Sequence, residues 1–185
     1  MATRDDVLGA ALRHLNTDAT ASMAAIAEAA GISRATLHRH FAKREALVRE
    51  LGERSLDRWE RTQDEAGIDA AGASGDAERI RDCATAMLTQ LVADADEFGF
   101  TLVDEFLCTE PALLERTDRL FDREVAFWAA AQDAGVLRRD VPARWIGHAA
   151  YGLLVASRDA IRSGDVAPRD LAPLVLSTFL DGASA

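Results

Sequence analysis

Apolar residues recur every three to four positions along most of the chain, which is the spacing of amphipathic helices. A polar stretch at 16–21 ends the first such pattern, which consists of Val7, Leu8, Ala11, Leu12 and Leu15. No sustained alternation with a period of two is present, so no strand is predicted. We therefore predict an all-α fold of about nine helices.

Two short helices joined by a glycine are predicted next. Ser22 and Ser33 are good N-caps, because a serine hydroxyl accepts a hydrogen bond from the free backbone N–H groups of the first turn. Gly31 directly follows the first of these helices, at a position where the backbone requires a positive φ. A longer helix is predicted to run from Arg44 to about Glu65.

The later part of the chain is also predicted to be helical. Residues 67–75 are rich in Gly, Ala and Ser and lack an apolar face, so we interpret them as the loop between the early and late helices. A shorter helix is predicted over Glu97–Leu107. Three prolines suit the first turns of the last long helices, namely Pro111, Pro142 and Pro168.

The net charge of the 185-residue chain is −10, which by itself argues against a nucleic-acid partner, because phosphate binding requires cations. The charge is unevenly distributed, however. Residues 1–54 carry 8 Lys and Arg against 7 Asp and Glu, and the rest of the chain carries 13 against 24. Between Ser33 and Arg49 there are five cations and a single anion, Glu45. This local excess is typical of a nucleic-acid surface confined to one part of a protein.

The basic segment coincides with the two short helices, a combination typical of a DNA-binding helix-turn-helix. In the helix that begins at Ser33, Leu37 and Phe41 are four positions apart, so both are expected to pack against the preceding helix. Small and polar residues at its start would let this helix enter the major groove. Two short helices joined by a glycine also occur in proteins that never contact DNA, so the shape alone leaves that alternative open.

Residues 22–47 resemble the DNA-binding region of the TetR (tetracycline-repressor-like) family of transcriptional regulators. Besides the capping Ser22, the matching features are Ile26-Ala27, Ala30-Gly31-Ile32-Ser33, Thr36-Leu37, Phe41 and Arg44-Glu45-Ala46-Leu47. The resemblance covers about the first 55 residues by motif, and the remainder matches in length and helical content. His38 stands where the family most often has Tyr, and Arg44 where it most often has Lys.

The resemblance implies an N-terminal helix-turn-helix head in residues 1–45 and a helical effector-binding and dimerisation body in residues 46–185. The three head helices would span Arg4–Leu15, Ser22–Ala30 and Ser33–Phe41, with the third in the major groove. The residues implied to face DNA bases are Arg34, Ala35, Thr36 and Arg39. The other DNA-binding residues would lie near phosphates, and they are Ser22, Ser33, His38, His40, Lys43 and Arg44.

The resemblance further implies that the last two long helices pair with those of a second copy, which would give a homodimer on a near-palindromic operator. They correspond to Pro142–Arg162 and Pro168–Leu180, and small residues on the first permit close helix approach. The residues expected in this interface are Ala149, Leu153, Ala156, Leu174 and Thr178. Packing within the chain competes for some of these faces.

An effector cavity among the middle helices is implied as well. Its candidate lining residues are Phe98, Phe106, Phe127, Trp128 and Tyr151. Aromatic residues at helical spacing are more often core than ligand contacts, so core packing stays open for each. Asp104, Glu105 and Glu124 lie on the same helices, and we interpret them as solvated surface residues; an inward-facing carboxylate would favour a cationic ligand.

No motif in the sequence points to catalysis or to a metal. His38 and His40 are two positions apart on a helix, so they diverge rather than share a metal. Cys83 and Cys108 form neither a zinc-ligand pattern nor a disulfide framework, and we interpret both as buried thiols. We therefore expect no enzymatic activity, no metal and no cofactor.

The apolar runs are too short to span a membrane and the N-terminus is acidic, so we expect a cytoplasmic protein without a membrane partner. The predicted function is a ligand-responsive transcriptional regulator whose partners are a double-stranded DNA operator, a second copy and an unidentified small-molecule effector. Repression is the commoner sign in such families, and activation stays open. The alternatives are an effector-independent DNA binder and a helical protein-binding adaptor.

Overall fold

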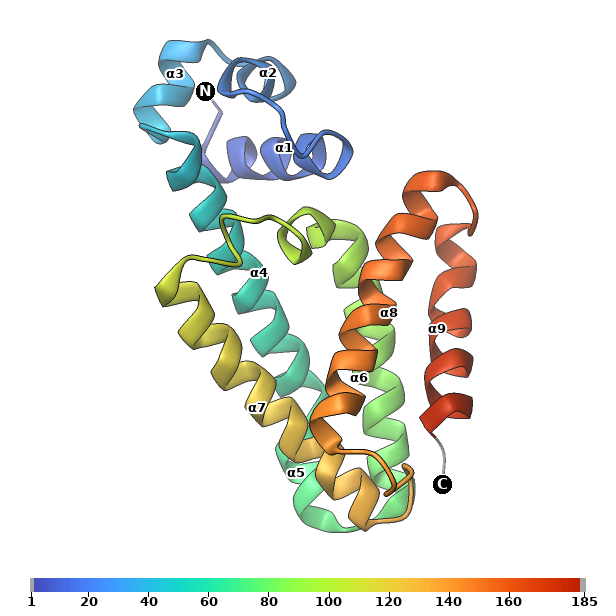
Figure 1. The fold of residues 1–185 in the computed structure, drawn as a ribbon. Helices are drawn as coiled ribbons and strands as arrows, with labels where there is room; N and C mark the ends of the chain where they lie inside the picture. The colour runs from blue at the N-terminus through green and yellow to red at the C-terminus, as the bar shows by residue number, and fades with distance from the viewer. Residues whose placement is uncertain (1, 184–185) are drawn as a thin grey trace.

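The computed structural model describes residues 2–183, which form nine α-helices and one short 3-10 helix (Figure 1). These elements are α1 (Arg4–Thr17), α2 (Met23–Ala29), α3 (Arg34–His40), α4 (Arg44–Ala66), α5 (Ile68–Ser74), α6 (Ala77–Phe98), η1 (Gly99–Leu102), α7 (Pro111–Asp133), α8 (Ala143–Ser163) and α9 (Pro168–Ala183). The predicted all-α fold of about nine helices is confirmed. Within residues 2–183, no helix combines the length and the apolar composition that a membrane crossing needs.

The head consists of α1, α2 and α3, and the predicted N-caps of α2 and α3 are confirmed. The hydroxyl oxygens of Ser22 and Ser33 accept hydrogen bonds from the backbone N–H groups of Ala25 (3.3 Å) and Thr36 (3.1 Å). Gly31, between α2 and α3, has a φ of 65°, which glycine adopts without a Cβ clash. These signals fix where the two short helices begin and how the chain turns between them.

The body is built around α6, which packs against α4, α8 and α9, while α7 packs against α4, α5 and α8. Helix α4 leads from the head down into the body, and α8 and α9 run side by side along one edge (Figure 1). Proline opens the later helices as predicted: Pro111 and Pro168 are the first residues of α7 and α9, and Pro142 is the N-cap of α8.

The prediction of a loop at 67–75 was wrong, because this segment forms the short helix α5 between two glycines with positive φ. Ile68 and Ala71 are buried, so the short apolar face that periodicity missed is enough to hold the helix in the body core. Gly72 lies against α7, where an added Cβ would be 3.4 Å from the Cβ of Ala130. A close approach to α7 thus accounts for the small residues.

The predicted helix Glu97–Leu107 was also wrong. Helix α6 continues through Phe98, only Gly99–Leu102 form a 3-10 turn, and the following residues make turns up to Pro111. Cys108 lies in these turns and is exposed, contrary to the prediction of a buried thiol, whereas Cys83 is buried. Burial raises the pKa of the Cys83 thiol to about 11, so this cysteine is protonated at neutral pH.

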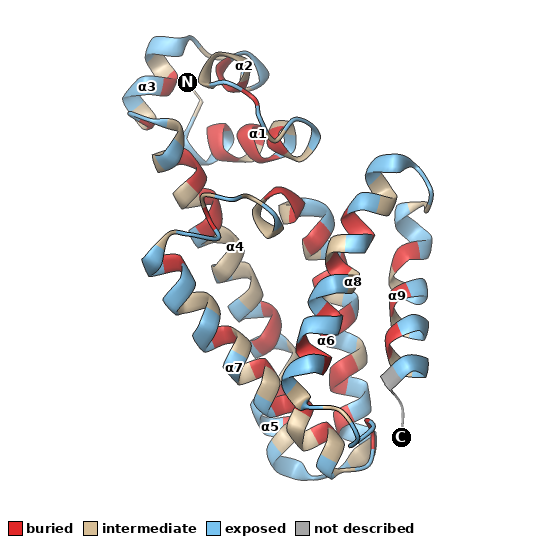
Figure 2. Cartoon of the chain, in the orientation of Figure 1, coloured by how far each residue is buried: buried red, intermediate tan, exposed pale blue. Residues whose placement is uncertain are grey.

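The buried apolar side chains form two clusters, one in the body around α6 and one in the head. The head cluster includes three residues that follow α6 in the chain, namely Phe100, Leu107 and Leu113. Figure 2 shows buried segments on the head helices, on the adjoining part of α4 and on the segment after α6. The head therefore rests on a platform from the body, and the division at residues 45 and 46 stays a prediction.

Candidate functional site

Helix α3 presents one apolar and one polar face, as its sequence predicts. Leu37 and Phe41 are 0% and 1% exposed and pack into the head core. The opposite face carries Arg34, Ala35, His38 and Arg39, all of them exposed, and Thr36 is half-buried. Anchoring by the apolar pair therefore turns two arginines toward solvent.

Three cations on or just after α3 have no partner within the described chain. The side chains of Arg34, Arg39 and Lys43 are exposed and make no hydrogen bond or ion pair with any of residues 2–183. Ser22 is exposed at the start of α2, which packs directly against α3. The structure thus brings the predicted base-facing and phosphate-facing residues onto one end of the molecule.

Other predicted DNA-binding residues have contacts inside the head. One Nη of Arg44 donates to the backbone carbonyl of Ala19 (2.7 Å), and its guanidinium lies 5.9 Å from the ring centroid of Phe100. The side chain of His40 is half-buried beside Phe41, and its backbone carbonyl accepts a hydrogen bond from Arg4 (2.6 Å). Arg44 therefore links the α1–α2 turn to the body platform.

A cavity of about 380 Å³ lies in the body between α4, α6, α7 and α8. Two of the predicted lining residues, Phe98 and Tyr151, line it, and the hydroxyl of Tyr151 donates to the carbonyl of Leu102 (2.5 Å). The other three lie outside the lining. Phe127 and Trp128 are 3% and 0% exposed in the body core, and Phe106 packs against the head core.

The residues that α4 contributes to this cavity were missed by the sequence prediction, which considered only aromatic residues of the later helices. Gly52, Leu56 and Trp59 form this wall, facing Phe121 of α7. The helical spacing of Leu51 and Trp59 indicated that α4 has an inward face, but no local pattern shows that this face borders a cavity. Helix α4 therefore belongs to the head at one end and to the cavity wall at the other.

Glu124 is not the solvated surface residue that the sequence predicted. Its side chain is buried, 4% exposed, and its two oxygens accept hydrogen bonds from the indole N–H groups of Trp59 (3.0 Å) and Trp128 (3.1 Å). Burial raises the pKa of Glu124, while hydrogen bonds from Trp128, Trp59 and Gln63 oppose this shift. Because Glu124 lies among the cavity-lining residues, it places a carboxyl group at a largely apolar wall.

The signal for this burial was present in the sequence. Glu124 falls on the same face of α7 as Leu120, which is four positions earlier, and as Phe127 and Trp128, which are three and four positions later. The other two carboxylates of that prediction are closer to what was expected: Glu105 is exposed, and Asp104 is half-buried and accepts a hydrogen bond from the backbone N–H of Leu107 (3.2 Å).

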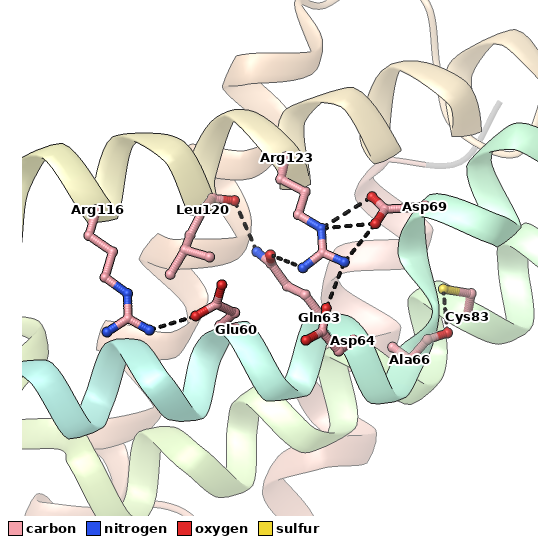
Figure 3. Close-up of polar contacts among 9 residues, drawn as sticks. All are labelled: Glu60, Gln63, Asp64, Ala66, Asp69, Cys83, Arg116, Leu120 and Arg123. Carbon is pink, nitrogen blue, oxygen red and sulfur yellow. Dashed lines mark hydrogen bonds and ion pairs between the residues drawn. The ribbon is translucent and has the colours of Figure 1, made fainter.

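The second half of α4 is fixed to α7 and α5 by paired arginines (Figure 3). Arg123 lies 2.8 Å from Asp64 and 2.7 Å from Asp69, and its hydrogen bond to Asp69 is the main reason that its pKa is raised. Fully buried Gln63 donates to the carbonyl of Leu120 (3.0 Å). One half of α4 is thus anchored in the body while the other carries the head.

The outer faces of α8 and α9 carry apolar residues without partners in the described chain. Trp145 is 62% exposed and Leu174 is 48% exposed, which is unusual for such large side chains. Of the predicted interface residues, Ala149, Ala156, Leu174 and Thr178 are exposed and Leu153 is half-buried. Ala149, Leu153 and Thr178 also line a shallow groove together with Trp145, so three of the five gather in one place.

The comparisons with known proteins agree with this arrangement. Residues 8–51 match the family model described as "Bacterial regulatory proteins, tetR family". This match covers most of α1, all of α2 and α3, and the beginning of α4, and so it includes the elements that form the basic end of the molecule. No protein of curated function matches the sequence.

Solved structures with the same fold cover nearly the whole chain. A TetR-like transcriptional regulator from Mycobacterium smegmatis, in complex with proflavine, has a TM-score of 0.76 at 20% identity, over 97% of this chain and 94% of that one. The ketosteroid transcriptional regulator of Mycobacterium tuberculosis gives 0.72 at 16% identity, over 100% and 96%. AibR, in complex with isovaleryl coenzyme A and operator DNA, gives 0.69 at 17% identity, over 95% and 96%.

At these identities the structural likeness shows a common fold, and the family model adds a match over residues 8–51. The chain therefore resembles the tetR family of bacterial regulatory proteins over residues 8–51, and it shares its fold with solved TetR-like regulators along nearly its whole length.

Proposed function

We propose that the protein is an effector-responsive repressor that binds a near-palindromic operator as a homodimer. The observation that carries the proposal is the set of free cations on the head. Arg34, Arg39 and Lys43 are exposed and unpaired within the described chain, although the protein as a whole carries 31 acidic residues. Three unpaired cations gathered on and just after one short helix, in so acidic a protein, are best explained by an anionic partner.

On DNA, α3 would enter the major groove with Arg34, Ala35, Thr36 and Arg39 toward the base edges. Ser22, Ser33, His38, His40 and Lys43 would lie near the phosphates. Arg44 would act mainly by holding the α1–α2 turn on the body platform, since one of its Nη atoms is bound to the Ala19 carbonyl. AibR, a protein of the same fold, has been solved with operator DNA, which supports DNA as the partner.

Dimerisation would use the outer faces of α8 and α9. Trp145 and Leu174 are large apolar side chains that water covers in the single chain, and burying them against a second copy would be favourable. Exposed Ala149 and Ala156 would allow the helices of two copies to approach closely. A twofold dimer would place the two α3 helices about 34–36 Å apart, one turn of DNA, which requires a near-palindromic operator.

The cavity would be the effector site. Its volume of about 380 Å³ suits a small organic molecule, and related folds have been solved with proflavine and with isovaleryl coenzyme A. Gly52, Leu107 and Leu113 line the cavity, and the two leucines also belong to the head core. A ligand in the cavity would therefore press on residues that support the head.

The mechanism would be a shift between two body shapes. An effector that binds one shape better stabilises it by the difference in binding free energy, typically about 1–3 kcal/mol. The anchored half of α4 would stay with α7, while the half nearer the head would tilt with Leu107 and Leu113. The two heads of the dimer would then lose the spacing that the operator requires.

DNA binding is tested by fluorescence anisotropy, with labelled DNA from upstream of the gene and an excess of nonspecific competitor. We expect specific binding that weakens steeply with salt and is reduced roughly 10- to 100-fold by Arg39→Ala. Arg81→Ala is the matched control, because Arg81 is an exposed arginine of α6 far from α3 in the chain. Equal effects of the two substitutions would contradict the proposal that α3 contacts the bases of the operator.

Two further outcomes separate the alternatives. If selection from random-sequence DNA also enriches nothing, the helical adaptor replaces the repressor. If the protein binds its operator but no compound that occupies the cavity changes that affinity, the protein is an effector-independent DNA binder.

A further inference from the structure

The polar group at the cavity that most restricts its ligand is the carboxyl group of Glu124. It is 96% buried, and it lines a cavity whose other walls are mostly apolar or aromatic. A carboxylate with this degree of burial is costly unless a positive charge or several donors compensate it. The groups around Glu124 therefore show whether the protein itself supplies that compensation.

The closest partners of Glu124 are two indole N–H donors, and the side chain of Gln63 also donates to it. Trp59 and Trp128 each give one indole N–H to it, and an indole has no acceptor for the O–H of a protonated carboxyl group. The two hydrogen bonds favour the charged form, whereas burial opposes it. Two oxygens have room for about four hydrogen bonds, so an acceptor position remains beyond those that the two indoles and Gln63 occupy.

No positive charge of the described chain compensates Glu124. The arginines nearest in the chain and the arginine of the cavity wall are paired elsewhere: Arg123 with Asp64 and Asp69, and Arg58 with Asp94 at 2.7 Å. Within residues 2–183, no ion pair includes Glu124.

The other lining residues also offer groups that attract a positive charge. The ring of His148 packs on Phe121, with centroids 4.8 Å apart, and the aromatic side chains of Trp59, Phe98 and Tyr151 complete an aromatic wall. Aromatic faces attract cations through their quadrupole. Asp94 and the exposed Asp118 are the other two carboxylates of the lining. Asp94 neutralises the one guanidinium, Arg58, whereas Asp118 has no ion pair within residues 2–183.

We propose that this cavity selects lipophilic organic cations, with an aromatic body against the apolar wall and an ammonium or amidinium group on the carboxylate of Glu124. The inference rests on the proposed function, since this cation would be the effector. It excludes anionic ligands such as fatty acids, because a second carboxylate beside Glu124 would be repelled without compensation. The volume of about 380 Å³ favours two or three fused rings rather than a long chain.

The test is isothermal titration calorimetry with three probes of the same shape and different charge: 2-naphthylmethylammonium, 2-naphthylmethanol and 2-naphthoate at neutral pH. We expect the wild-type protein to bind the cation at least about tenfold more tightly than the alcohol and to bind the anion most weakly. In Glu124→Gln the preference for the cation over the alcohol should fall to less than about twofold, while the affinity for the alcohol changes little.

Glu115→Gln is the matched control. Glu115 is also on α7 and is exposed, pairs with Arg119 at 2.8 Å, and is not among the cavity-lining residues, so its loss removes the same charge elsewhere. This variant should keep the wild-type preference. A preference that is equal in Glu124→Gln and wild type, or equally reduced in both variants, would overturn the assignment to Glu124.

The wild-type series decides the inference even if Glu124→Gln does not fold. If the alcohol binds as tightly as the cation, or the anion binds best, the proposed ligand class is wrong. The cavity would then still be a ligand site, and the proposed repressor function would stand with a neutral or anionic effector. If none of the three probes binds, the ligand class is overturned, and release of operator DNA by other compounds then decides the proposed function separately.

Discussion

The arginines of α3 and three arginines that connect helices of the body have opposite surroundings. On α3 of the head, Arg34 and Arg39 project into solvent without a partner in the described chain. In the body, Arg58, Arg116 and Arg123 each lie within 2.7 Å of an aspartate or glutamate. Exposed arginines without an ion pair in residues 2–183 also occur in the body, for example Arg61 of α4 and Arg81 of α6. What indicates where a polyanion binds is therefore the gathering of unpaired cations on and just after one short helix, and not the net charge of −10.

The structure also reduces the number of cations in the basic segment that are available for DNA. Of the five cations between Ser33 and Arg49, two are engaged inside the structure. Arg44 holds the Ala19 carbonyl, and Arg49 lies 2.9 Å from Glu110. The cations that remain for DNA are therefore those on or just after α3.

The largest effect is expected from removing a contact that joins the head to the body, because the two regions would then be free to unfold separately. Phe100 is 0% exposed and fills the head core from the body side. Phe100→Ala should lower the free energy of unfolding by about 3–5 kcal/mol, because it leaves a cavity between the two regions. Urea denaturation followed by circular dichroism measures this loss.

Tryptophan fluorescence shows whether the join is broken. All three tryptophans, Trp59, Trp128 and Trp145, lie outside the head helices, so their fluorescence reports on the body alone. Circular dichroism and fluorescence should give one transition in the wild type and separate transitions in Phe100→Ala. Val103→Ala, at an exposed position nearby, should change stability by less than about 0.5 kcal/mol. Coincident transitions in Phe100→Ala would show that the regions are joined elsewhere.

The second prediction concerns a substitution that displaces side chains at the contact between head and body without removing any of them. An added Cβ at Gly52 of α4 would lie 2.7 Å from a methyl group of Leu107 and 3.0 Å from one of Leu113. Alanine is favoured over glycine in a helix by about 1 kcal/mol, but displacing the two buried leucines costs about 1–3 kcal/mol. Gly52→Ala should therefore be less stable than the wild type, or at best equal to it, and should bind operator DNA more weakly.

Gly9→Ala is the control for helix propensity, because a Cβ at Gly9 would meet only the end of Arg13 at 3.5 Å. This variant should gain stability by up to about 1 kcal/mol and keep its affinity for DNA. If Gly52→Ala gains as much as Gly9→Ala, the leucines yield freely and the junction does not restrain α4.

Much of the head could be predicted from the sequence because its signals are local. Serine caps, a glycine with positive φ and apolar residues four positions apart each act within one or two turns, and Ser22, Ser33 and Gly31 have the predicted roles. The loop prediction at 67–75 failed because α5 is held by tertiary contacts. Its Gly72 faces Ala130, almost sixty positions later in the chain.

The cavity was harder to predict for the same reason. Glu124 was read as a surface residue because carboxylates are rarely buried, and what overrides that tendency is a pair of donors from α4 and α7. Phe127 and Trp128 occupy the same face of α7 as Glu124, yet they fill the body core and leave the cavity to Phe121. Periodicity identifies an inward face, but it does not distinguish core from cavity.

The third prediction sharpens the difference between free and paired cations. Lys43 is exposed and unpaired within the described chain, whereas Arg116 lies 2.7 Å from Asp57 and 2.6 Å from Glu60. Lys43→Ala should reduce the slope of log affinity against log salt by about 1 for each protomer on the operator, because one phosphate contact is lost. Arg116→Gln should leave the slope unchanged. Anisotropy titrations at several salt concentrations decide this, and equal slopes in all three proteins would contradict a phosphate contact at Lys43.

The smallest effect is expected from removing the carboxylate of Asp69, a partner of the body arginine Arg123. It is tested by the pH dependence of the free energy of unfolding. The hydrogen bond from Arg123 lowers the pKa of Asp69, and the charge of Arg123 adds to this shift. A carboxyl group with a lowered pKa in the folded state stabilises the protein above its unfolded pKa of about 3.9, and this stability is lost as the pH falls through the folded pKa. Asp69→Asn should thus be less stable than the wild type at pH 7 by at most about 1 kcal/mol, since the pair is largely exposed.

The difference between wild type and Asp69→Asn should shrink as the pH falls below about 4 and disappear once Asp69 is protonated in the folded protein. Urea denaturation at a series of pH values measures it. Asp82→Asn is the control, because Asp82 is exposed on α6 and has no ion pair within residues 2–183. That variant should follow the wild type at every pH. A loss in Asp69→Asn that is the same at pH 3 and pH 7 would mean that the side chain acts through packing, and the contrast between paired body arginines and free head arginines would then lose its electrostatic basis at this site.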